Sequence, residues 1–485
     1  MKIGRTSIFR LVLATFTLGA AAISADLDLI GVTALRAKYP ELNGSGQTVA
    51  VAEASVGSAW QVSPSTVGQP ESLFRYYDST HPYGGAGAGF IPALASGHAG
   101  LVGNHFFGAT AGVSPGVAAV ENFAADYFVL DVVARTTTVG STTSWTPVGI
   151  NPPIINQSFV FLTTDPEIVT EVSLAYDGYA NRFGTLFING ANNGSSTFVY
   201  APGSMYNGIT VGTLSGNHSG GVHLVAPGTA TSFATPYVSG VATLLRQAAE
   251  LGHFEAMDGV DPTDARLLKA ALLNGATKTE GWSQTETNPL DEVFGAGVVN
   301  AKSSHDMLSG GQHTASLQTL ETPGSVPTTT TPANFLSATS GWDINTLSTA
   351  VSSDAVNHYF FDLSTSSNVA FTATVTWNSL TDVDLGINDI SNFDLVLVDT
   401  LTGTILWSSH STTENIEHIY LTGLSGSIFD VQVILRGDGG VVTDEYALVW
   451  SWTAVTTPVP ESGVFWAIGL AGFLGLAIHT RRPRR

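Results

Sequence analysis

Four short apolar runs constrain the fold of this chain most strongly. They are QTVAVAEAS at 47–55, PIINQSF at 153–159, TLFIN at 185–189 and a fourth run at 207–213. Each is short for a helix and apolar at successive positions, which is typical of a strand buried on both faces. Between the second and third runs, apolar residues recur on one helical face. Strands that alternate with helices predict an α/β domain with a parallel sheet.

The pattern changes near Leu308. Residues 309–337 include the Pro- and Thr-rich stretch PGSVPTTTTPAN and predict a linker. Beyond it, segments such as VAFTATVTW, FDLVLVD and IFDVQVIL alternate between apolar and polar residues, with turn residues between them. We therefore predict an α/β domain over 26–308 and an all-β sandwich of jelly-roll type over 338–454.

The N-terminus has the pattern of an export signal. Basic residues precede an apolar run at 11–22, and the small residues of AAISAD follow it. This arrangement predicts a secretory signal peptide over 1–25. The chain has no cysteine, so disulfides, zinc–thiolate sites and cysteine nucleophiles are excluded.

The last segment, 455–485, combines a Pro-rich lead, a run of apolar and small residues at 463–478, and four arginines. The run is short for a full membrane span, which takes roughly 20 residues. The segment resembles the PEP-CTERM sorting signal, which implies attachment of an exported protein to the membrane or cell surface of a bacterium. A plain C-terminal membrane anchor is the alternative interpretation.

The charge of the chain limits its partners. The formal net charge is −21, with only 18 lysines and arginines among 485 residues. A chain this acidic is poorly suited to a phosphate backbone, so we expect no nucleic-acid partner.

Polar residues suited to acyl transfer occur where the predicted strands end or helices begin. They are an acid, a histidine, an asparagine and a serine, in the order Glu53, His98, Asn192, Ser232. Acyl transfer uses a hydroxyl nucleophile, an imidazole base, a carboxylate that orients the imidazole and a donor to the oxyanion. Three of these residues also have a purely structural interpretation. Ser232 could be a helix N-cap and Asn192 a turn residue. His98 could be an ordinary residue of a first helical turn, in which case His81 or His105 would be the candidate base.

Six motifs in one order, TVAVAEASV, SGHAGLVGN, INQSFV, NGANNG, VAPG and TSFATPYVSG, resemble those of the subtilisin-like serine peptidases. The resemblance covers about residues 26–308. It implies that Ser232 is the nucleophile, His98 the base, Glu53 the orienting acid and Asn192 the oxyanion donor. It also implies that Ser158 and Phe159 lie on the edge that pairs with a peptide substrate.

The sequence departs from the family at several of these positions. Glu53 stands where the family has aspartate, so the carboxylate has one extra methylene to accommodate. Ala191 and Gly100 replace a glycine and a threonine near Asn192 and His98, and Val160 replaces a glycine on the substrate edge. These departures leave a second hypothesis, a non-catalytic cell-surface binding protein with a peptidase fold.

The β domain resembles domains appended to secreted bacterial peptidases. Its aspartates, Asp382, Asp384, Asp389 and Asp394, either hold a structural calcium ion or are solvated loop acids. We predict no metal in the catalytic site and no cofactor. The sequence as a whole predicts a secreted or surface-attached serine endopeptidase that acts on polypeptides.

Overall fold

The computed structural model describes residues 20–325, 331–332, 334–349, 353–366, 368–437 and 443–454. The predicted sorting signal and all but residues 20–25 of the predicted signal peptide lie outside these ranges. Within the ranges, no helix is both long enough and apolar enough to cross a membrane.

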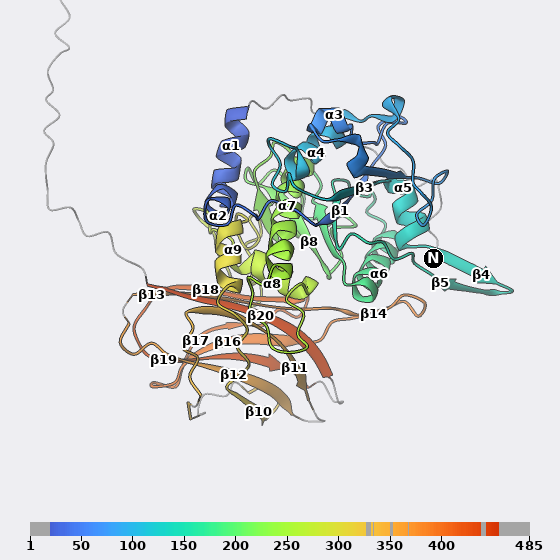
Figure 1. Cartoon of the computed structure of the whole chain (residues 1–485). Coiled ribbons are helices and arrows are strands. Elements are labelled where there is room, and N and C mark those ends of the chain that lie inside the picture. Colours follow the sequence, from blue (N-terminus) through green and yellow to red (C-terminus); the bar gives the residue numbers. More distant parts are fainter. Residues whose placement is uncertain are drawn as a thin grey trace, which may run out of the picture.

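A seven-stranded parallel sheet forms the centre of the N-terminal lobe (Figure 1), in the order β2-β3-β1-β6-β7-β8-β9. The strands are β1 (Thr48–Glu53), β2 (Phe74–Tyr77), β3 (Ala119–Ala124), β6 (Ile154–Gln157), β7 (Leu186–Gly190), β8 (Gly208–Thr213) and β9 (Leu224–Ala226). The four apolar runs became β1, β6, β7 and β8, which are buried along almost their whole length. The predicted α/β class with a parallel sheet is therefore confirmed.

Helices flank this sheet. They are α1 (Ala20–Leu29), α2 (Val32–Lys38), α3 (Pro64–Val67), α4 (Gly97–Phe107), α5 (Ala125–Tyr127), α6 (Pro166–Phe183), α7 (Thr231–Glu250), α8 (Ala265–Asn274) and α9 (Ala301–Leu308). Short helical turns occur at Glu71–Leu73, Pro92–Leu94 and Phe128–Val133. The long helix α7 packs on β6, β7 and β8, and α4 packs on α7. A small hairpin, β4 (Thr136–Val139) and β5 (Thr142–Trp145), projects from the lobe (Figure 1).

The C-terminal lobe is a sandwich of two antiparallel sheets. One has the order β10-β12-β19-β16-β17, with β10 (Leu317–Glu321), β12 (Asp354–Asp362), β19 (Ile428–Leu435), β16 (Phe393–Asp399) and β17 (Thr404–Ser409). The other has the order β11-β20-β13-β18, with β11 (Ser340–Ser348), β20 (Thr443–Ala454), β13 (Val369–Trp377) and β18 (Ile416–Leu424). A separate hairpin pairs β14 (Leu380–Asp382) with β15 (Ile387–Asp389). The predicted all-β sandwich is confirmed, while its assignment as a jelly roll stays a prediction.

Strand β10 lies inside the interval that we predicted as a linker. It pairs antiparallel with β12 along its whole length, so residues 317–321 belong to the sandwich. The sequence LQTLE did not indicate a strand, because the residues of this edge strand are mostly exposed and show no apolar alternation.

The two lobes are packed together. Trp342, Ile416, Ala447 and Val449 of the four-stranded sheet belong to the same buried apolar cluster as the N-terminal sheet and helices. The hydroxyls of Thr372 and Thr374 in β13 donate to the side-chain oxygen of Asn274, the last residue of α8, at 2.8 and 3.1 Å. The sandwich therefore covers the helical surface formed by α8 and α9 (Figure 1).

Candidate active site

Ser232 is the second residue of α7, and it is not the N-cap. The N-cap position is held by Ala230, whose side chain can make no capping hydrogen bond. The structural interpretation of Ser232 as a capping residue is therefore wrong. Ser232 is 7% exposed and lies at the positive end of the helix macrodipole, a location that favours negative charge.

Pro236 lies in the interior of α7, beyond its first turn. Proline has no N–H, so it cannot bond the carbonyl four residues earlier, which is that of Ser232. The hydroxyl of Ser158 donates to this carbonyl at 2.9 Å. The hydroxyl of Ser232 in turn donates to the Ser158 carbonyl at 3.3 Å. Ser158 thus compensates for the proline and fixes the backbone of the candidate nucleophile.

The turn before α7 is set by Gly228 and Asn193. Gly228 has φ +152°, and a Cβ there would come within 2.7 Å of the Ala234 nitrogen, so a larger residue would displace the helix start. The side-chain oxygen of Asn193 accepts the backbone N–H of Thr231 at 2.9 Å. Asn193 therefore satisfies a helix-start donor that Ala230 leaves unpaired. We did not single out Asn193, although it directly follows Asn192 in NGANNG.

Glu53 and His98 come together in the structure. Glu53 ends β1, His98 is the second residue of α4, and Glu53 Oε2 lies 2.9 Å from His98 Nδ1. Both side chains are buried, at 1% and 7% residue exposure. The extra methylene of glutamate is therefore accommodated within hydrogen-bond distance. Glu53 Oε1 and His98 Nε2 have no hydrogen-bond partner among the described residues.

His98 also lies against the nucleophile helix, since its ring centroid is 5.6 Å from that of Phe233. The Glu53 contact to Nδ1 makes Nδ1 the donor in the neutral ring and leaves Nε2 as a base. This is the tautomer that removal of a hydroxyl proton requires.

The competing histidines are placed differently. His105 lies on the same helix between Phe233 and Tyr237, with ring centroids 6.2 and 4.8 Å away, and neither of its ring nitrogens has a partner among the described residues. Burial lowers the pKa of His105 to about 4. His81 pairs with Asp78 at 3.2 Å in an exposed turn. Of the three, only His98 has a buried carboxylate against its ring.

Asn192 lies in the loop after β7. Its backbone N–H donates to the Ser219 hydroxyl at 3.0 Å, and its carbonyl accepts from the Ser219 N–H at 2.8 Å. Its side-chain amide makes no hydrogen bond with the described residues, so the amide N–H groups are available to a ligand. Ser219, which holds this loop, gave no signal in the sequence.

Ser158 and Phe159 follow directly after the last residue of β6. Ser158 carries the contacts to Ser232 described above, and both residues are buried, at 2% and 5% exposure. Two residues further on, the Phe161 N–H donates to the Ala201 carbonyl at 2.8 Å. Pairing of this segment with a peptide substrate stays a prediction.

The candidate calcium ligands are dispersed. Asp394 pairs with Arg436, Asp384 accepts the Trp145 N–H at 2.6 Å, and Asp382 accepts the Leu385 N–H at 3.0 Å. Among the described residues, no group of three or more histidines, aspartates and glutamates is arranged to hold a metal ion.

A carboxylate–histidine pair beside the start of a serine-bearing helix is an arrangement suited to hydrolysis by a serine nucleophile. The family model of the subtilases matches residues 33–297, more than half of the chain. The chain therefore belongs to the subtilase family of serine peptidases.

Solved structures of peptidases are similar to a little over half of this chain. The prenylagaramide maturation protease PagA is 20% identical, with 58% of this chain and 99% of that chain covered and a TM-score of 0.39. A protease from Pseudoalteromonas arctica is 16% identical, with 54% and 90% covered and a TM-score of 0.35. A cold-adapted subtilisin-like serine proteinase is 18% identical, with 53% and 88% covered and a TM-score of 0.33. No curated protein sequence matches the chain.

Proposed function

We propose that this protein is an exported, surface-attached serine endopeptidase that hydrolyses polypeptides through an acyl-enzyme on Ser232. The observation that carries the proposal is the buried 2.9 Å contact between Glu53 Oε2 and His98 Nδ1, beside the helix that bears Ser232. Membership of the subtilase family supports peptide-bond hydrolysis as the reaction.

Each residue has a separate role in this mechanism. The Ser232 hydroxyl attacks the scissile carbonyl while His98 Nε2 takes its proton, and Glu53 stabilises the resulting imidazolium. The side-chain N–H of Asn192 donates to the oxyanion. His98 then returns the proton to the leaving amine, and a water molecule hydrolyses the ester by the reverse use of the same groups. The uncommitted Nε2 of His98 supports its role as the base.

Export and attachment rest on the terminal segments. The pattern at 1–25 supports secretion, and the tripartite pattern at 455–485 supports retention at a bacterial membrane or cell surface. The net charge of −21 supports polypeptide rather than nucleic-acid partners. No cofactor is part of the proposed mechanism.

One observation favours the alternative, a non-catalytic binding protein. The Ser232 hydroxyl donates to the Ser158 carbonyl, and His98 Nε2 is not its partner. Catalytic hydrogen bonds are often long or misaligned without substrate, so we regard this contact as the resting position of the hydroxyl.

Labelling with a fluorophosphonate separates the two functions. The full chain is compared with Ser232→Ala and with Ser239→Ala, a matched control on the same helix whose hydroxyl is already bonded to the Asn156 side chain and the Thr235 carbonyl. We expect stoichiometric labelling of the wild type and of Ser239→Ala, and none of Ser232→Ala. An unlabelled wild type, or labelling that persists in Ser232→Ala, contradicts the proposed peptidase.

A further inference from the structure

The loop that carries Asn192 is bonded to the nucleophile helix through Thr231. The Thr231 hydroxyl donates to the Ala191 carbonyl at 2.6 Å, on one side of Asn192. On the other side, the Thr231 backbone N–H donates to Asn193 Oδ1 at 2.9 Å. Ser232 follows Thr231 directly in the sequence. Both neighbours of the predicted oxyanion donor are therefore bonded to the residue that precedes the candidate nucleophile.

The two contacts of Thr231 differ in the kind of group that accepts them. Ala191 contributes a backbone carbonyl, which is present whatever side chain stands at that position, and the residue is buried. Asn193 contributes a side-chain oxygen, and the residue is exposed. The Thr231 hydroxyl also lies 3.2 Å from Asn193 Oδ1, but its single proton is used in the shorter contact to Ala191. The bond on the C-terminal side of Asn192 therefore depends on the identity of the residue at position 193.

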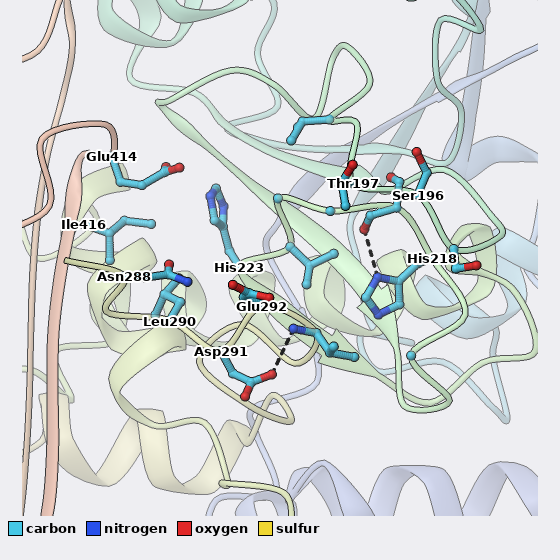
Figure 2. Close-up of a pocket in the computed structure, with 18 of the residues that line it drawn as sticks. Ser196, Thr197, His218, His223, Asn288, Leu290, Asp291, Glu292, Glu414 and Ile416 are labelled. Atoms are coloured by element: carbon cyan, nitrogen blue, oxygen red, sulfur yellow. Dashed lines mark hydrogen bonds between the residues drawn. The ribbon is translucent and has the colours of Figure 1, made fainter. Parts of the chain in front are cut away.

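A second segment, 217–219, holds the backbone of Asn192 itself. The Asn192 N–H donates to the Ser219 hydroxyl at 3.0 Å, and the Asn192 carbonyl accepts from the Ser219 N–H at 2.8 Å. This segment is fixed in turn by His218, whose ring is buried and whose Nδ1 donates to the Ser219 carbonyl at 3.0 Å (Figure 2). The loop of Asn192 is thus bonded to α7 and to a segment with a fixed backbone.

These contacts matter because of what an oxyanion donor must do. Its N–H group stabilises the transition state only where the negative charge develops, and a misplacement of about 1 Å can cost about 10²-fold in rate. The contacts with Ser219 fix the backbone of Asn192, whereas the contact of Asn193 fixes the loop relative to α7. We propose that Asn193 is a positioning residue that holds the Asn192 amide at the distance from Ser232 that the oxyanion requires. This inference rests on the proposed function, because it assigns a role in the same reaction.

A purely structural role of Asn193 leads to a different expectation. Asn193 accepts an N–H group at the start of α7, so its removal lowers the free energy of unfolding in either case. A structural role leaves the reaction rate of the folded protein unchanged. A positioning role acts through Asn192, so the loss of Asn193 lowers the rate only while the Asn192 amide is present.

The test is the reaction of the full chain with a fluorophosphonate, whose phosphoryl oxygen takes the place of the oxyanion in the tetrahedral adduct. The maximal labelling rate, kinact, and the half-saturating concentration, KI, are measured for the wild type, Asn192→Ala, Asn193→Ala and the double variant. We expect Asn192→Ala to lower kinact by about 10²-fold or more. We expect Asn193→Ala to lower kinact by about tenfold with KI unchanged. Adding Asn193→Ala to Asn192→Ala should lower kinact by less than about twofold further.

The matched control is Asn217→Ala. Asn217 is an exposed asparagine of the neighbouring segment, and its side chain makes no hydrogen bond with the described residues. Its backbone carbonyl, which accepts the Gly194 N–H at 3.4 Å, remains in the variant. We expect kinact of Asn217→Ala within about twofold of the wild type. Urea unfolding checks that each variant is folded, and the near-isosteric Asn193→Leu, which also lacks an acceptor, replaces Asn193→Ala if that variant fails to fold.

Failure of this proposal is distinguishable from failure of the proposed function. An unlabelled wild type contradicts the peptidase itself and, with it, any positioning role. If the wild type is labelled, three results overturn the role of Asn193 alone. They are a wild-type kinact in Asn193→Ala, a change confined to KI, and an equal fractional loss of kinact with and without the Asn192 amide.

Discussion

Within the part of the chain that the structure describes, two histidine–carboxylate pairs are buried, one in each lobe. His98 Nδ1 lies 2.9 Å from Glu53 Oε2 in the N-terminal lobe, and His358 Nδ1 lies 2.8 Å from Asp430 Oδ2 in the sandwich. All four side chains are buried. Distance and burial alone therefore do not distinguish a catalytic pair from a structural one.

The difference lies at the other ring nitrogen. His358 Nε2 is paired with the Thr319 hydroxyl at 3.0 Å, which joins β12 to the edge strand β10. His98 Nε2 has no partner among the described residues, and its ring lies beside the start of α7. In the His358–Asp430 pair, both ring nitrogens are hydrogen-bonded, so the pair connects strands. In the Glu53–His98 pair, Nε2 is uncommitted and lies near a serine-bearing helix, so it can accept a proton.

The largest expected effect is that of His98→Ala. It removes the proposed base, so we expect kcat/KM on a peptide substrate to fall by about 10⁴-fold or more, with the fold retained. The comparison variant is His358→Ala, which removes the histidine partner of the buried Asp430 carboxylate, while the Gln432 side-chain N–H still donates to Asp430 Oδ2 at 2.8 Å. We expect it to lower the free energy of unfolding by about 3 kcal/mol and to change kcat/KM by less than about twofold.

Kinetics and urea unfolding on both variants check this prediction. Loss of activity in folded His358→Ala, or wild-type activity in His98→Ala, would erase the distinction between the two pairs.

Glu53 gives the next largest effect. Glu53→Gln preserves the length of the side chain but removes the charge that favours the catalytic tautomer and the imidazolium, so we expect a loss of about 10³- to 10⁴-fold in kcat. Glu53→Asp keeps the charge and shortens the reach by about 1.5 Å, and we expect a loss of about 10²-fold. If Glu53→Asp is as active as the wild type or more active, the backbone at residue 53 places an aspartate carboxylate within reach of His98 Nδ1, which contradicts this prediction.

His105 tests the same comparison within one helix. Its pKa of about 4 in the fold is below the ordinary value of 6.5, because burial penalises the charged ring. The free energy of unfolding is therefore highest above pH 6.5 and decreases as the pH falls towards 4, because His105 of the unfolded chain binds a proton at a higher pH than His105 of the folded chain. This amounts to about 3 kcal/mol between the two limits. We expect His105→Leu to lose less stability than the wild type between pH 7 and 4.5, as measured by urea unfolding. An equal loss in both proteins would contradict this assignment.

The sequence predicted the elements whose residues are buried on both sides. The runs that became β1, β6, β7 and β8 have no solvent-exposed face, so their pattern is that of strands buried on both sides. It did not single out β2, whose FRYY exposes Arg75, or β10, whose residues are mostly exposed. Edge strands carry a weak pattern because fewer of their residues enter a core.

The candidate site was predicted where a motif names a residue, and missed where the contact is long-range. Glu53, His98, Asn192 and Ser232 each sit at the end of a strand or the start of a helix, a position that a local pattern can indicate. The hydrogen bonds from Ser158 to Ser232 and from Asn192 to Ser219 join residues 74 and 27 positions apart. No spacing rule on one strand or helix reports such pairs.

The smallest effect we predict concerns the contact that Asp384 makes between the lobes. Its Oδ1 accepts the Trp145 N–H at 2.6 Å, linking the β14–β15 hairpin of the sandwich to β5. Because Asp384 is exposed, water replaces most of what this bond contributes, and we expect Asp384→Ala to lower the free energy of unfolding by less than about 1 kcal/mol. The control is Asp389→Ala. This exposed aspartate pairs with Leu380 through the hairpin backbone, but its side chain makes no hydrogen bond with the described residues, so the substitution should have no measurable effect. Thermal unfolding with calcium and with a chelator checks both variants.

If these aspartates instead bind calcium, the chelator will lower the Tm of the wild type by several degrees, and both variants will lose that sensitivity together. The hairpin would then be a metal site rather than a weak polar contact between lobes that are joined mainly by the apolar cluster around Trp342.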